Sequence, residues 1–155
     1  MLNLRRSVVG LVAVLLVSGV ALAQTSETAD IAALRVRANA GDANAQFILG
    51  LAYADGEGVP QDDAQAVSWF RKSAEQGDSG AQHFLGGVYR NGQGVPQDYV
   101  ESHKWHNLAA SRASAEDQER YAEIRDVLAS LMTPQQIADA QQRATEWLAA
   151  FEQRN

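Results

Sequence analysis

The chain has 155 residues, with 13 Lys and Arg against 19 Asp and Glu, so its formal net charge at pH 7 is −6. This length predicts a single domain, and the acidic balance argues against binding to nucleic acid, which requires clustered positive charge. The chain has no cysteine, so we expect neither disulfides nor a lipid-modified cysteine, and packing alone must stabilise the fold.

The first 23 residues have the pattern of a secretory signal peptide. Two arginines precede an apolar run over residues 8–20, and a small-x-small motif ends at Ala23. The apolar run is shorter than the roughly 20 residues that a membrane span needs. We therefore predict cleavage after Ala23, no stable membrane anchor afterwards, and a periplasmic or secreted domain over residues 24–155. Its net charge is −8, because both arginines leave with the signal peptide.

A signature of eleven identical positions occurs twice in the chain, 36 residues apart. The first copy is Ala45, Gln46, Leu49, Gly50, Tyr53, Gly56, Gly58, Val59, Pro60, Gln61 and Asp62, and the second is Ala81, Gln82, Leu85, Gly86, Tyr89, Gly92, Gly94, Val95, Pro96, Gln97 and Asp98. Trp69 and Ala74 recur in the same register as Trp105 and Ala110. A repeat of this period is typical of a solenoid, in which each unit packs on the next.

Each repeat is predicted to form a pair of helices joined by a turn. Residues 44–55 are apolar on nearly all sides, and residues 63–76 place apolar side chains at helical spacing. Between them, two glycines and a proline over residues 56–60 favour a sharp turn. We therefore expect a helix hairpin in the first copy and an equivalent one in the second.

Aspartates are predicted to start these helices. Asp62 is expected to cap the second helix of the hairpin, with Gln65 completing a reciprocal capping box, and Asp98 and Glu101 repeat the pattern. Before each repeat, Gly41-Asp42 and Gly77-Asp78 are predicted to end one helix and cap the next.

Glycines in the middle of the first helix of each repeat are predicted to be contact points between helices. Gly50 shares one helical face with Ala45, Leu49 and Tyr53, and Gly86 is its counterpart in the second copy. A glycine inside a helix costs roughly 1 kcal/mol relative to alanine. Close packing against a neighbouring helix would offset that cost, so we assign these positions to the core.

The repeated pattern resembles the Sel-one-like repeat, a relative of the tetratricopeptide repeat, over residues 45 to about 112. This resemblance implies an all-α fold, a short right-handed α/α solenoid that is used chiefly for protein interaction. The predicted boundaries are a signal peptide at 1–23 and one domain at 24–155, with a half-repeat at 29–43, repeats at 44–79 and 80–112, and a helical cap at 113–155.

The repeat pattern fails after Ser111, and two further helices are predicted over residues 116–130 and 134–151. Thr133 and Gln136 have the spacing of a capping box that starts the last helix. Its apolar stripe consists of Ile137, Ala140, Ala144, Trp147, Leu148 and Phe151. We interpret the pair as a cap that covers the end of the solenoid, which argues against open end-to-end stacking and predicts a monomer.

The sequence contains no recognised catalytic motif. Ser-x-x-Lys, His-Glu-x-x-His and Gly-x-Ser-x-Gly are all absent, as is a cysteine nucleophile. We therefore predict a non-enzymatic adaptor or regulator that binds an unidentified protein partner and needs no cofactor. Two alternatives stay open: a hydrolase of the β-lactamase-like type found among cysteine-rich relatives, and a self-assembling structural protein of the envelope.

His103 and His106 are the best candidates for chemistry, because a spacing of three residues places both imidazoles on one helical face. They are candidates for a metal site or for a pH-dependent contact. In the alternative interpretation they are structural, since they occupy the register of Val67 and Phe70, and His106 is then a semi-exposed aromatic side chain.

The concave face of the solenoid is the expected binding surface. Removing the core positions of the first helix of each repeat leaves six residues for this face: Phe47, Leu51, Ala54, His83, Gly87 and Arg90. These positions differ between the two copies, as recognition positions do. For Phe47 and Leu51, packing in the core is the stronger interpretation.

Overall fold

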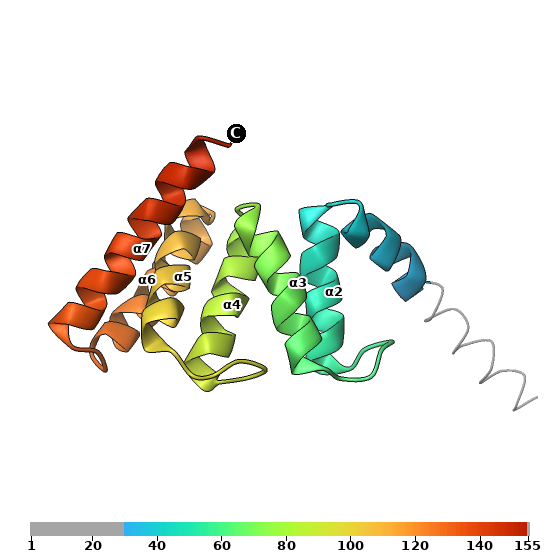
Figure 1. Ribbon diagram of the computed structural model, residues 1–155, viewed down its shortest axis with the longest axis horizontal. Helices are drawn as coiled ribbons and strands as arrows, with labels where there is room; N and C mark the ends of the chain where they lie inside the picture. Colours follow the sequence, from blue (N-terminus) through green and yellow to red (C-terminus); the bar gives the residue numbers. More distant parts are fainter. Residues whose placement is uncertain (1–29, 155) are drawn as a thin grey trace, which may run out of the picture.

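The computed structural model describes residues 30–154, and every regular element in that range is an α-helix (Figure 1). The predicted signal peptide lies outside the described residues. Within residues 30–154, no helix combines the length and the hydropathy that crossing a membrane requires.

The helices form an array in chain order. A leading helix over residues 30–39 is followed by α2 (Ala43–Asp55), α3 (Asp63–Glu75), α4 (Ser79–Asn91), α5 (Tyr99–Arg112), α6 (Ala115–Ala129) and α7 (Pro134–Glu152). Helices α2 to α5 each pack on the next in turn, and α5 also packs on both α6 and α7. Figure 1 shows them side by side along the long axis. The prediction of an all-α solenoid of helix hairpins is confirmed.

The predicted N-caps are confirmed, but the capping boxes at Asp62 and Asp98 are wrong. The Asp62 side chain accepts from the backbone N–H of Gln65 at 3.0 Å. However, the Asp62 N–H donates to the carbonyl of Tyr53 at 2.9 Å, so it is not available to the Gln65 side chain. The same bond joins Asp98 to Tyr89, also at 2.9 Å. A backbone bond therefore closes each hairpin in place of the second half of the box.

The mid-helix glycines are contact points, as predicted. A Cβ atom at Gly50 would lie 2.6 Å from two ring carbons of Phe70, and one at Gly86 would lie 2.5 Å from Cε1 of His106. Phe70 and His106 are the register equivalents in α3 and α5. Each hairpin therefore closes by placing a flat ring directly on a glycine backbone.

A buried glutamine links each repeat to the helix before it. The Gln46 side chain donates to the carbonyl of Ala38 at 2.9 Å, and Gln82 donates to the carbonyl of Ala74 at 3.1 Å. Ala38 belongs to the leading helix and Ala74 to α3. The leading helix therefore meets the first repeat through the same bond that joins the two repeats.

The loop between α4 and α5 packs against the start of α3. Gly94 has a φ of 69°, and a Cβ atom there would lie 2.5 Å from the carbonyl oxygen of Asp63. Only glycine allows both this backbone conformation and this approach. The contact fixes the position of the loop relative to the first repeat.

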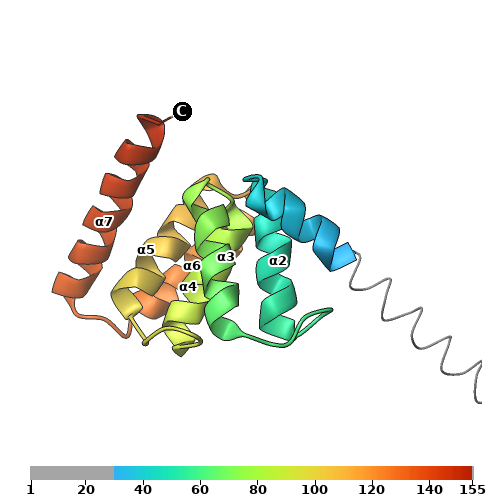
Figure 2. The ribbon, with the colours of Figure 1, turned by 45° about the vertical axis from the view of Figure 1, so that its right-hand side comes forward.

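Two helices follow the repeats close to where they were predicted, and Thr133 and Gln136 form the expected capping box. Helix α6 buries Tyr121 and Leu128, and α7 buries Ala140 and Ala144. Figure 2 shows α7 running obliquely at the end of the array. Apolar surface is still exposed in this region, since the side chains of Val127 and Leu131 are 65% and 61% exposed.

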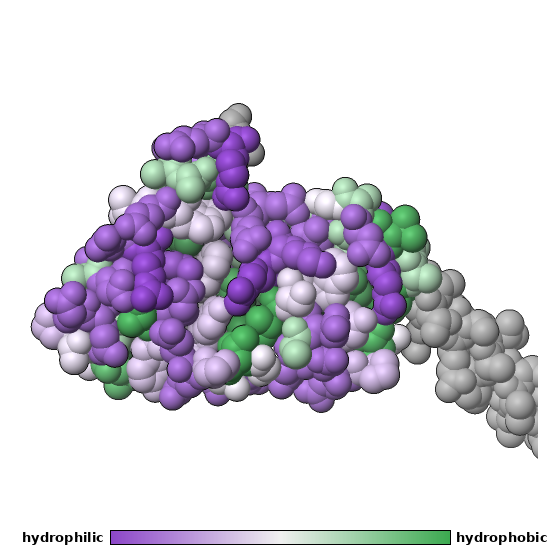
Figure 3. Space-filling view, viewed as in Figure 1, coloured by the Kyte–Doolittle hydropathy of each residue, from purple (hydrophilic) through white to green (hydrophobic). Residues whose placement is uncertain are grey.

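The opposite end of the array also exposes apolar side chains. Val36 in the leading helix is 69% exposed and Ile48 in α2 is 41% exposed. Figure 3 shows apolar residues at the surface of the leading helix, on a face that is otherwise mostly hydrophilic.

Candidate binding groove

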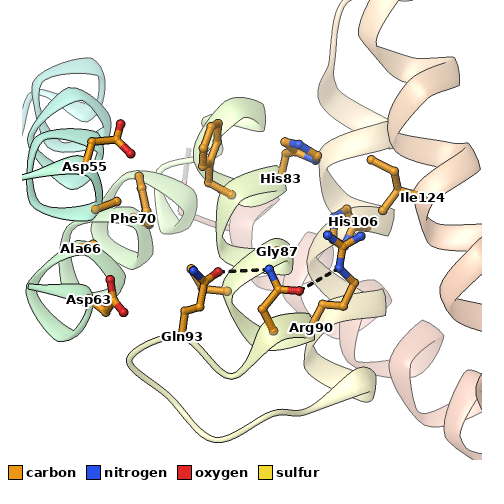
Figure 4. Close-up of a pocket in the computed structure, with 14 residues that line it drawn as sticks. Asp55, Asp63, Ala66, Phe70, His83, Gly87, Arg90, Gln93, His106 and Ile124 are labelled. Carbon is orange, nitrogen blue, oxygen red and sulfur yellow. Dashed lines mark hydrogen bonds between the residues drawn. The ribbon is translucent and has the colours of Figure 1, made fainter.

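A groove with a volume of about 380 Å³ lies between the two repeats. Residues of five helices, α2 to α6, line it, and they include Asp55, Asp63, Phe70, His83, Phe84, Gly87, Arg90, His106 and Ile124 (Figure 4). Helices α2, α4 and α6, which alternate along the chain, all contribute to it. The groove is therefore built by the stacking of repeats, and no single hairpin could form it.

Aromatic rings form a continuous row along the groove. The ring centroids of Phe70 and Phe84 are 5.5 Å apart, those of Phe84 and His83 are 5.7 Å apart, and those of His83 and His106 are 5.3 Å apart. His83 also stacks on Tyr121 of α6, at 4.4 Å and an interplanar angle of 16°. These side chains give the groove an apolar floor on which a flat or aliphatic group can pack.

His106 is held in the neutral state by its surroundings. Its side chain is buried, and Nδ1 lies 2.8 Å from the carbonyl oxygen of Ser102, so the ring donates from Nδ1. Burial lowers the pKa of His106 to about 4, although the bond to Ser102 favours the charged form, and the neighbouring His83 and Arg90 lower the pKa further. The expectation that His106 is semi-exposed is therefore wrong, because the ring lies between Gly86 and the core.

His103 is also buried, and the structure does not join it with His106 in a metal site. Burial lowers the pKa of His103, and the charge of Arg125 lowers it further. Its Nδ1 atom has no hydrogen-bond partner. Among residues 30–154 there is no group of three His, Cys, Asp or Glu side chains that could hold a metal ion. His106 packs on Gly86 and beside the ring of His83, and a pH-dependent role for either histidine stays a prediction.

Opposite charges lie on opposite sides of the groove. Asp55 at the end of α2 and Asp63 at the start of α3 lie on one side, and Arg90 of α4 lies on the other (Figure 4). The Arg90 Nε donates to the side chain of Asn91 at 3.2 Å, and Asn91 donates in turn to Gln93 at 3.1 Å. These two hydrogen bonds hold the basic side chain of Arg90 at the mouth of the groove.

The family model of the Sel1 repeat matches residues 43–78 and 79–114. The chain contains two Sel1 repeats. Each matched repeat begins one residue before the boundary predicted from the sequence, and together they span α2 to α5. Among curated proteins, no sequence matches the chain.

Solved structures of Sel1-repeat proteins resemble this one. A protective antigen of uropathogenic Escherichia coli with an SLR fold is 34% identical over 78% of this chain, with a TM-score of 0.72. A Sel1 repeat protein from Oxalobacter formigenes is 33% identical over 56% of this chain, with a TM-score of 0.55. The chain covers only 25% and 36% of those two proteins. Sel1 repeat proteins generally mediate protein–protein interaction.

The structure brings together four of the six residues predicted for the concave face. Ala54, His83, Gly87 and Arg90 line the groove between the Sel1 repeats. The other two pack partly into the core, as the alternative interpretation held: Phe47 lies 5.4 Å from the ring of Phe84, and Leu51 lines a separate cavity towards the leading helix. That any of them contacts a partner stays a prediction.

Sequence reasoning missed Phe84 and Ile124, which also line the groove. Phe84 is 42% exposed, and its counterpart in the first Sel1 repeat, Ile48, is 41% exposed. The sequence signal that could have identified Phe84 was a large apolar residue at the same outward-facing position in both copies. Ile124 had none, because it lies in α6, where the repeat pattern is absent.

Proposed function

We propose that this chain is an exported, non-catalytic adaptor or regulator of the periplasm, and that it binds a protein segment in the groove between its Sel1 repeats. The observation that carries the proposal is the groove itself. It is lined by an apolar aromatic floor with charged groups at its mouth, a composition that suits a peptide segment. The general use of Sel1 repeats in protein interaction supports the same function.

A photo-crosslinking experiment in cells tests the binding surface. A photoreactive phenylalanine analogue placed at Gly87 would project into the groove, because a Cβ atom there has no other heavy atom within 4 Å. The matched control carries the analogue at Gln141, an exposed position in α7 outside the groove. We expect a discrete adduct with another protein from position 87 alone. Equal adducts from both positions, or none from position 87, would contradict the proposal.

Export is tested separately, by fractionation and N-terminal analysis of the purified protein. The proposal requires a periplasmic protein that begins at residue 24. A cytoplasmic protein that keeps residues 1–23 would refute the proposed location and leave the binding surface untouched.

A further inference from the structure

We propose that the groove selects a peptide segment in which an apolar side chain lies between a basic residue and an acidic residue. The apolar side chain sits on the aromatic floor, the basic residue faces Asp55 and Asp63, and the acidic residue faces Arg90. This inference rests on the proposed function and specifies the partner.

The apolar position follows from the floor of the groove. Phe84 leaves 42% of its surface exposed, and the rings of Phe70 and His83 flank it. Covering exposed aromatic surface with an apolar group is favourable, because it removes that surface from water. The adjacent Gly87 leaves open space at the same level, so a bulky side chain can enter without displacing one from the protein.

The basic position follows from the two carboxylates on the α2–α3 side. Asp55 and Asp63 both line the groove. Within residues 30–154, neither carboxylate has a hydrogen-bond or ion-pair partner. Asp62, the neighbouring acid, already caps α3, so it is occupied. Two unpaired carboxylates at one wall of a groove favour a cation on the bound segment.

The acidic position follows from Arg90, on the opposite side (Figure 4). Within residues 30–154, the only hydrogen bond of its side chain runs from Nε to Asn91, which leaves the terminal nitrogens of the guanidinium free to contact a carboxylate. Burial lowers the pKa of His83 on the same helix, and the charges of Arg120 and Arg90 lower it further, while Asp117 opposes them. A segment lying across the groove therefore meets charges of opposite sign at its two ends.

Selection from a displayed library of random 12-residue peptides tests the inference. The bait is the 24–155 protein at low ionic strength, where exposed charge pairs are least screened. We expect enriched sequences in which an aromatic or large aliphatic residue has Lys or Arg on one side and Asp or Glu on the other. A consensus without both charges, or no enrichment at all, would overturn the inference.

Charge variants then assign each end of the peptide to a wall. The double variant Asp55→Asn with Asp63→Asn should weaken binding of the best peptide about three- to tenfold, and should not weaken a version of it whose basic residue is replaced by glutamine. The matched control, Glu75→Gln with Glu116→Gln, removes the same net charge outside the groove and should change binding less than twofold. Equal losses in both double variants would overturn the inference.

Arg90→Gln is the corresponding variant of the other wall. It should weaken binding of the same peptide by a similar factor, and it should not weaken binding of a version whose acidic residue is replaced by glutamine. If Arg90→Gln leaves binding of the unmodified peptide unchanged, the acidic position is wrong and the inference falls.

A blocking variant separates failure of this inference from failure of the proposed function. Gly87→Trp fills the groove, and Gly87→Ala controls for the change in the helix. If Gly87→Trp abolishes binding while the charge variants have no effect, the groove is a binding surface and only the charge pattern is refuted. If Gly87→Trp leaves every selected peptide bound, the groove is not the binding surface, and both proposals fail.

Discussion

Two adjacent glycines of α4, Gly86 and Gly87, allow a direct measurement of how tightly the hairpin closes. Replacing either with alanine should gain up to about 1 kcal/mol from helix propensity and reduced freedom of the unfolded chain. At Gly87 the new Cβ atom has no other heavy atom within 4 Å. At Gly86 it would lie 2.5 Å from Cε1 of His106, a ring that is buried and hydrogen-bonded to Ser102.

The two variants should therefore change stability in opposite directions. Gly87→Ala should raise the free energy of unfolding by about 0.5 to 1 kcal/mol. Overpacking a core costs about 1 to 3 kcal/mol, so Gly86→Ala should lower the free energy of unfolding by up to about 2 kcal/mol after a helix gain of about 1 kcal/mol is subtracted. The gain from helix propensity is common to both variants, so the difference between their free energies of unfolding measures the cost of displacing the His106 ring. For a domain of this size, each kcal/mol shifts the Tm by about 3 to 5 °C.

The assay is urea and thermal unfolding of the 24–155 protein at pH 7.5, followed by circular dichroism at 222 nm. Gly50→Ala repeats the test in the first hairpin, where the ring is Phe70 and the Cβ contact would be 2.6 Å. It should destabilise the protein as Gly86→Ala does. If Gly86→Ala proves as stabilising as Gly87→Ala, the close approach of ring to backbone does not exist.

Three further predictions concern the junctions between elements. The pKa of His106 is about 4 in the folded protein against an ordinary value of 6.5, so the unfolded chain binds protons first as the pH falls. The contribution of His106 to stability should therefore be complete above about pH 6.5 and fall by roughly 3 kcal/mol on acidification to pH 4, and His106→Phe, with the residue found at Phe70, should remove this part of the acid loss in urea unfolding. Gly94→Ala should lower the free energy of unfolding by about 2 to 3 kcal/mol, because it adds a clash with a backbone carbonyl to an unfavourable φ; Gly41→Ala, with a φ of 95° and nothing within 4 Å, should cost only about 1 kcal/mol. Glu101→Gln should cost about 1 kcal/mol in the same assay and reduce the salt dependence of stability, because it breaks two ion pairs, at 2.6 and 3.0 Å.

Each of these predictions has a result that contradicts it. A His106→Phe protein that loses stability with acid as steeply as the original would show that other groups cause the pH dependence. Equal costs for Gly94→Ala and Gly41→Ala would mean that the loop after α4 does not touch α3. Unchanged stability and salt dependence in Glu101→Gln would show that its ion pairs contribute nothing.

Local features of the fold could be predicted from the sequence because they depend on a few neighbouring residues. Asp62 and Asp98 cap helices through bonds to amides two or three residues ahead, and Thr133 does the same in α7. The capping boxes failed for a non-local reason. The N–H of Asp62 bonds to Tyr53, nine residues back across the turn, and only the closed hairpin brings the two together.

The lining of the groove was partly predictable for the same reason. Helical periodicity placed His83, Gly87 and Arg90 on one side of α4, and the repeat register indicated the equivalent side of α2. Periodicity could not show that α6 closes the groove, because α6 has no counterpart in the repeats. The burial of His106 was missed for a related reason: the register identified its aromatic role but carried no information on how deeply the packed helices cover the ring.

The buried glutamine bonds at the repeat junctions make the array extensible. Gln46 reaches the carbonyl of Ala38 and Gln82 reaches that of Ala74, so the junctions before the first and second Sel1 repeats present the same donor and acceptor. A further 36-residue copy inserted between Asp78 and Ser79 would find a matching carbonyl before it and a matching glutamine after it. The number of units can therefore change by duplication or deletion without redesign of either surface. Each added unit would lengthen the array by one hairpin and add one more surface between successive Sel1 repeats.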